Sequence, residues 1–109
     1  MTKRARLRQL HRWLEAVVPG PKPTRLTFVR KSGGDSGRAT YVPGDPEVVL
    51  LVNTFNPLNE CIHTLFEEHA HGQVMVTGSD RHTERWGAAY QKIRELYDDR
   101  GGRSGSRSY

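Results

Sequence analysis

The chain has 109 residues, of which 35% are hydrophobic and 27% are charged. This length supports one domain with a single modest core, and no apolar run is long enough to cross a bilayer, which argues against a membrane protein. The lone cysteine, Cys61, excludes an intrachain disulfide and is typical of a reducing cytoplasm. The basic N-terminus is not followed by an apolar stretch, so no secretory signal is predicted and the expected location is cytoplasmic.

The formal net charge of +5 is unevenly distributed along the chain. Nine Lys and Arg residues fall within residues 1–31, against a single acid, Glu15. Basic segments of this kind attract nucleic acid. The candidate contacts are Arg4, Arg6, Arg8 and Arg12. The alternative is a solvated helix face that keeps the protein soluble, and the scarcity of interleaved aromatic residues favours it.

The N-terminal half predicts one helix and three strands. Apolar side chains in residues 4–18 recur at spacings of three and four, which indicates an amphipathic helix that ends at Pro19. Short strands are predicted at 25–30, 38–42 and 48–52, separated by turns rich in Gly, Pro and Asp. Because the connections are short, we expect one small sheet that is largely antiparallel.

Two further helices are predicted over about 58–72 and 83–97, the second with an apolar stripe that includes Trp86 and Tyr90. Residues 99–109 are rich in Gly, Ser and Arg and predict a disordered tail. The sequence therefore predicts a single α+β domain over residues 1–98.

The helix over 58–72 carries the chemically informative side chains. One predicted face is apolar, with Cys61 and His69 among its members, and the opposite face has groups that bind metal ions. These groups are Glu60, His63, Thr64, Glu67 and His71, with Glu68 at the edge. Glu67 and His71 are one turn apart, close enough to hold one ion, whereas His63 and His71 are separated by about 12 Å along the axis.

The segment Phe66-Glu67-Glu68-His69-Ala70-His71-Gly72 resembles the H-E-x-x-H helix of zincin metallopeptidases, with Glu67 in place of the first histidine. Residues 80–90 are similar to the H-x-x-x-W-G-x-x-Y segment of SprT-like peptidases and their small phage-encoded relatives, through His82, Trp86, Gly87 and Tyr90. The resemblance covers roughly residues 48–97. It implies a minimal zincin-like domain, with an N-terminal helix, a small sheet, a metal-site helix and a C-terminal helix.

The resemblance also implies a role for each matching residue. Glu67, His71 and His82 would bind a zinc ion, and Glu68 would act as the general base for attack of water on a protein or peptide substrate. Asp80, which the resemblance does not assign, either caps the last helix or orients His82 through its other ring nitrogen. A carboxylate ligand is acceptable to zinc, but it weakens the Lewis acid and makes manganese a second candidate. A decayed site that binds no metal is the alternative.

Other side chains near this helix have two interpretations each. His63 either supports Glu67 from the second shell or is an exposed polar residue, and Tyr90 either lies in the core or assists at the site. His69 is expected to pack in the core or bond a nearby carbonyl. The predicted function is a small SprT-like metallopeptidase. The alternatives are an inactive zincin-fold descendant that binds nucleic acid or protein, and a metal-dependent hydrolase of another substrate class.

Overall fold

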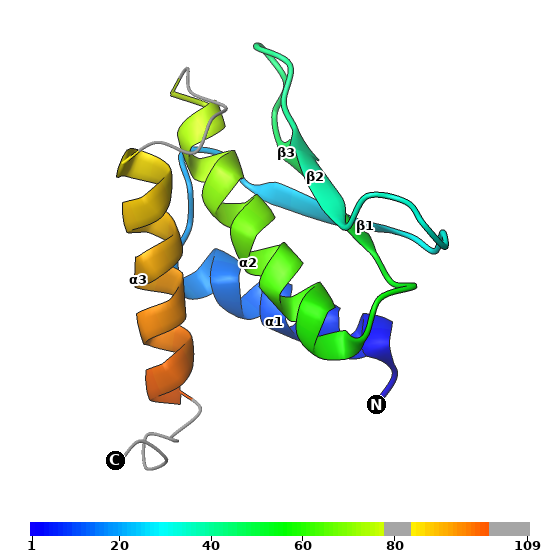
Figure 1. Ribbon diagram of the computed structural model, residues 1–109. Helices are drawn as coiled ribbons and strands as arrows, with labels where there is room; N and C mark the ends of the chain where they lie inside the picture. Colours follow the sequence, from blue (N-terminus) through cyan, green and yellow to red (C-terminus); the bar gives the residue numbers. More distant parts are fainter. Residues whose placement is uncertain (78–83, 101–109) are drawn as a thin grey trace.

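The computed structural model describes residues 1–77 and 84–100, and it confirms the α+β class and the predicted order of elements (Figure 1). The elements are α1 (Lys3–Val17), β1 (Thr24–Val29), β2 (Gly37–Thr40), β3 (Val48–Asn53), α2 (Leu58–Met75) and α3 (Glu84–Arg100). The helix α3 extends two residues into the segment 99–109, which was predicted to be a tail; residues 101–109 lie outside the described part.

The three strands form a mixed sheet in the order β1-β3-β2. β2 pairs antiparallel with β3, but β1 pairs parallel with β3, in a register that places Thr24 beside Val48. The sheet is therefore not purely antiparallel. The physical reason is that β3 is the most apolar strand and takes the central position, where both of its edges are paired. Residues 30–47, which include β2, supply the connection that a parallel pair requires.

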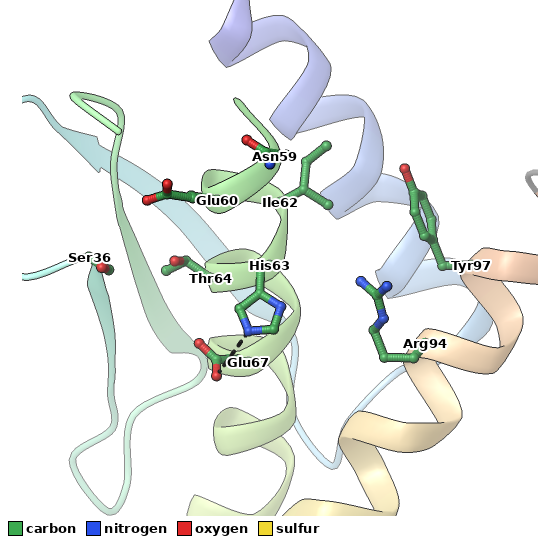
Figure 2. A pocket seen from close by; sticks show the side chains of 9 residues that line it. All are labelled: Ser36, Asn59, Glu60, Ile62, His63, Thr64, Glu67, Arg94 and Tyr97. Carbon is green, nitrogen blue, oxygen red and sulfur yellow. Dashed lines mark ion pairs between the residues drawn. The ribbon is translucent and has the colours of Figure 1, made fainter. Parts of the chain in front are cut away.

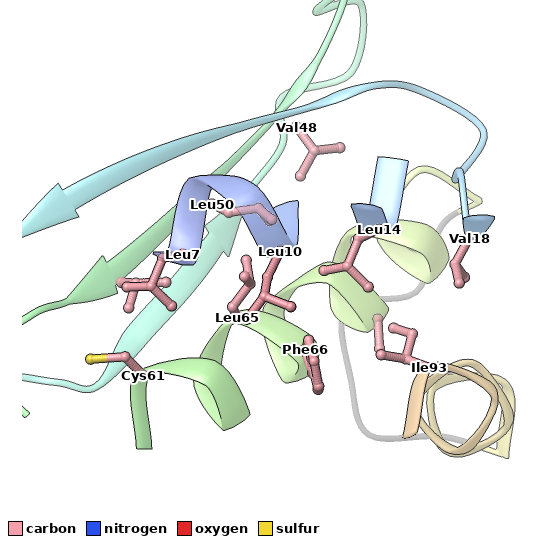
Figure 3. Close-up of a cluster of buried hydrophobic side chains, with 12 residues drawn as sticks. Leu7, Leu10, Leu14, Val18, Val48, Leu50, Cys61, Leu65, Phe66 and Ile93 are labelled. Atoms are coloured by element: carbon pink, nitrogen blue, oxygen red, sulfur yellow. The ribbon is translucent and has the colours of Figure 1, made fainter. Parts of the chain in front are cut away.

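The helices α1 and α2 cover one face of the sheet, and α3 packs beside α2 (Figure 1). The core between them contains completely buried leucines from α1, β3 and α2, together with Phe66 of α2 and Ile93 of α3 (Figure 3). Each such side chain contributes about 1.5–3 kcal/mol relative to an exposed one. The leucines are Leu7, Leu10, Leu14, Leu50 and Leu65. Cys61 is 1% exposed within the same cluster, as expected for a small buried side chain.

Buried and partly buried polar contacts join α1 to β1 and to α2. The Thr24 hydroxyl donates to Glu15 Oε2 at 2.7 Å and accepts from His11 Nε2 at 2.7 Å. His69 is completely buried, as predicted, and its Nε2 donates to the Val18 carbonyl oxygen at 2.7 Å. Burial lowers the pKa of His69, which keeps the ring neutral at pH 7. This ring therefore satisfies a carbonyl at the end of α1 and is not directed at a metal.

Two glycines allow α2 to lie close to the sheet. A Cβ at Gly72 would lie 3.2 Å from Cγ1 of Val48, so this glycine serves helix–strand packing, and α2 continues past its predicted end here to Met75. At Gly37, the first residue of β2, a Cβ would overlap the Leu51 carbonyl oxygen and lie 2.6 Å from Cγ2 of Thr64. The edge strand β2 therefore requires glycine where it meets α2.

We expect Gly37→Ala to lower the free energy of unfolding by about 1–3 kcal/mol, the usual cost of overpacking. Gly87→Ala is the matched control, because a Cβ there has no neighbour within 4 Å and the site is inside α3. This second change should stabilise the protein by about 0.5–1 kcal/mol. Urea unfolding followed by circular dichroism measures both, and equal effects of the two substitutions would contradict the assigned contact between β2 and α2.

Candidate functional site

A series of side-chain contacts on the polar face of α2 connects Glu67 and His63 with Tyr90 of α3. His63 Nε2 lies 3.4 Å from Glu67 Oε2, and the Tyr90 hydroxyl lies 2.8 Å from His63 Nδ1. A single tautomer serves both contacts, with the Nε2 proton directed at the carboxylate and Nδ1 accepting from the phenol. The His63 side chain is 53% exposed, and that of Glu67 is 33% exposed. The structure therefore places His63 between Glu67 and Tyr90, in contact with both.

His71 lies one turn beyond Glu67 and packs against an aromatic pair on α3. Its ring is T-shaped against Trp86, with centroids 5.5 Å apart. Trp86 in turn stacks on Tyr90, with centroids 5.4 Å apart and planes 2° from parallel. The residues His63 and His71 thus contact the two members of one aromatic stack. This stack therefore lies in the contact between α2 and α3.

A groove with a volume of about 570 Å³ opens beside Glu67 (Figure 2). Arg94 and Tyr97 of α3 form one side, and Ser36, just before β2, lies on the other. The base is formed by residues of α2: Asn59, Glu60, Ile62, His63, Thr64 and Glu67. The sequence did not identify Ser36, Arg94 or Tyr97 as site residues, because their proximity to α2 depends on long-range packing.

Glu68 is not among the residues that line this groove, and it lies against β2. Burial and the neighbouring charge of Glu67 raise the pKa of its carboxyl from 4.5 to about 7, while a hydrogen bond to the Ala39 backbone opposes the shift. The adjacent carboxylates therefore have different surroundings. Glu67 has an imidazole beside it, and Glu68 is half-buried between a helix and an edge strand. A carboxyl with a pKa near neutrality is suited to proton transfer.

We expect Glu68→Gln to raise the free energy of unfolding of chelator-treated protein above that of the wild type at high pH, and to leave it unchanged at low pH. The raised pKa means that folded protein binds the extra proton between pH 4.5 and about 7. The contribution of the Glu68 carboxyl to the free energy of unfolding is therefore fully present below pH 4.5. It is lost as the pH rises through about 7, because the carboxyl then ionises in its partly buried position. Allowing for partial exposure, the glutamine variant should be more stable by about 1–2 kcal/mol at pH 8 and equal at pH 4. Thermal unfolding across this range measures the difference.

Glu95→Gln on the exposed surface of α3 is the control for this experiment, since it changes the same charge without relieving burial. Parallel pH profiles of wild-type and Glu68→Gln protein would show that Glu68 is not desolvated in the folded state.

The predicted ligand set is only partly within the described residues. Glu67 and His71 lie on consecutive turns of α2, as an i, i+4 pair should for joint coordination. His82 and Asp80 lie outside the described residues. Within residues 1–77 and 84–100, no three His, Cys, Asp or Glu side chains are grouped so that they could hold a metal ion. The described donors, a carboxylate and an imidazole, suit zinc chemically and supply two of the three predicted positions.

The predicted basic contacts do not all face the same way. Arg4, Arg8 and Arg12 follow one another at intervals of one turn on α1, and all three are exposed. Arg6 lies on another side of the helix and donates to Gln9 Oε1 at 2.8 Å. In the part of the chain that the structure describes, no helix is long and apolar enough to span a membrane.

Comparison with known proteins gives no match to a family model, to a curated protein or to a solved structure. Membership of the SprT-like or zincin families therefore stays a prediction that rests on the two sequence segments.

Proposed function

We propose that this protein is a metal-dependent hydrolase of the SprT-like metallopeptidase type, which cleaves a protein or peptide substrate in the cytoplasm. In this proposal Glu67, His71 and His82 hold one zinc ion, with manganese as the second candidate, and Glu68 is the general base. The observation that carries the proposal is the placement of Glu67 and His71 on consecutive turns of α2 while Glu68 lies against the edge strand β2.

The packing of α3 supports a third ligand from the segment that precedes it. Trp86 lies against His71, and His82 is only four positions before Trp86 in the chain. A span of four residues covers at most about 14 Å. Under this proposal, the length of the chain allows His82 to act together with Glu67 and His71.

The bound ion would lower the pKa of water and polarise a substrate carbonyl. The other steps belong to the side chains. Glu68 accepts the proton of the attacking water and returns it to the leaving amine. His63 orients the Glu67 carboxylate, and Tyr90 holds His63 in the tautomer that does so. The groove of about 570 Å³ beside Glu67 is in the size range of substrate sites.

Elemental analysis of purified protein tests the metal site directly. We expect one equivalent of zinc or manganese, and a loss of at least tenfold in metal affinity in Glu67→Ala, His71→Ala and His82→Ala, because each removes one of three ligands. Glu95→Ala, on the exposed surface of α3, is the matched control and should retain the metal. Metal-free wild-type protein whose melting temperature does not change on addition of zinc or manganese would overturn the site.

Hydrolysis is tested separately with an unstructured protein substrate such as casein. Glu68→Gln should retain the metal but lose cleavage by at least a hundredfold, the usual contribution of general acid–base catalysis. Glu67→His should bind zinc more tightly, since an imidazole then replaces the carboxylate. Equal cleavage by wild-type and Glu68→Gln protein would exclude Glu68 as the base, whatever the metal content.

A further inference from the structure

A second groove, with a volume of about 410 Å³, lies where the start of α1 meets the ends of β1 and β3. Four cationic side chains line it, together with Thr2 and Thr54. The four are Lys3, Arg4, Arg8 and Arg30. It shares no residue with the groove beside Glu67. From the sequence, only Arg4 and Arg8 of this set were candidate contacts, because Arg30 follows β1 and comes close to α1 only in the folded protein.

These cations are held in place by the fold. The guanidinium carbons of Arg4 and Arg8 lie 5.4 and 5.2 Å from the centre of the Phe28 ring, one turn of helix apart. The Lys3 ammonium donates to the backbone oxygens of Thr54 at 2.9 Å and Asn56 at 2.7 Å. Ordering long side chains before a ligand binds reduces the entropy lost on association. The groove is therefore organised for an anion in the free protein.

In the part of the chain that the structure describes, the cations of this groove have no acidic partner. Among the described residues, no Asp or Glu lies within ion-pair distance of Arg4, Arg8 or Arg30. The first turn of α1 also contains no acid, so the positive end of the helix dipole adds to the local potential. By contrast, Arg25 pairs with Glu47 at 2.6 Å and Arg38 with Asp35 at 3.7 Å.

An exposed aromatic ring stands beside these cations. Phe55 follows the groove residue Thr54 and is 46% exposed, and the Arg30 guanidinium carbon lies 5.6 Å from the centre of its ring. A ring of this kind offers a stacking surface to a base that is not already stacked in a duplex. A cationic groove flanked by an accessible aromatic ring is the combination that single-stranded nucleic acids use.

We propose that this groove binds single-stranded nucleic acid, with Lys3, Arg4, Arg8 and Arg30 at the phosphates and Phe55 stacked on a base. A membrane surface fits less well, because Leu7, Leu10 and Leu14 of α1 are completely buried in the core and leave no apolar helix face to enter lipid. The site is independent of the proposed hydrolytic centre and needs no metal.

Fluorescence anisotropy of a labelled oligothymidylate, titrated with chelator-treated full chain at several salt concentrations, tests the proposal. Affinity should fall linearly on a log–log plot of salt, and the slope should decrease by about 0.7 for each phosphate-contacting cation removed. Arg4→Ala/Arg8→Ala is compared with Arg25→Ala/Arg38→Ala, which removes the same charge from arginines that have acidic partners. Only the first pair should reduce the slope by about 1.4.

Two single variants complete the experiment. Arg30→Ala leaves the contacts of α1 with Phe28 in place, so it tests the groove even if the double variant unfolds; it should lower the slope by about 0.7. Phe55→Ala should weaken binding at least about fivefold with no change in slope, since a stacked base contributes without charge. Circular dichroism confirms folding of each variant.

Equal losses of affinity and slope in the two double variants would mean that only the net charge of the protein attracts the oligonucleotide. This result would overturn the proposed binding groove. Unchanged affinity in Phe55→Ala would overturn base stacking. Tighter binding to duplex DNA or to phosphatidylserine vesicles than to the oligothymidylate would assign the groove to another partner and overturn the proposal.

Discussion

The packing of α2 is the constraint on which the rest of the structure depends. This helix contacts α1, β2, β3 and α3, so every layer of the fold meets on its surface. Its buried side is closed by Leu65, Phe66 and the neutral imidazole of His69. Because this side is fixed against the sheet, the helix cannot rotate, and the polar residues on its other side are held in one direction. The position of every candidate ligand on α2 follows from that apolar contact.

The same packing separates the two adjacent carboxylates. Glu67 lies beside His63 of the same helix, and the other ring nitrogen of His63 contacts the hydroxyl of Tyr90 on α3. Glu68 is turned about a third of a helical turn away, toward β2, where burial raises the pKa of its carboxyl to about 7. The strand β2 contacts this side of α2 at two places, with Gly37 against Thr64 and the Ala39 backbone bonded to Glu68. One helix thereby presents two carboxyl groups in different surroundings from consecutive positions.

The charge of the molecule is divided in a similar way between two grooves. The groove beside Glu67 contains two carboxylates and an imidazole, whereas the groove at the start of α1 is lined by four cationic side chains and two threonines. A polyanion and a metal-dependent reaction would therefore use different surfaces of the same small domain. The aromatic residues follow this division, with Trp86 and Tyr90 joining α2 to α3 and Phe28 and Phe55 beneath the arginines.

The sequence by itself determined the helices, the three strands, the burial of Cys61 and His69, and the i, i+4 relation of Glu67 and His71. These features depend on local periodicity, which is written in neighbouring residues. Only the tertiary structure decided the parallel pairing of β1 with β3, the contact of Tyr90 with His63, and the arrival of Arg30 beside Arg4 and Arg8. Each of these contacts joins residues that are more than twenty positions apart. Such contacts depend on the packing of the whole core, because no local sequence pattern specifies which distant surfaces will meet.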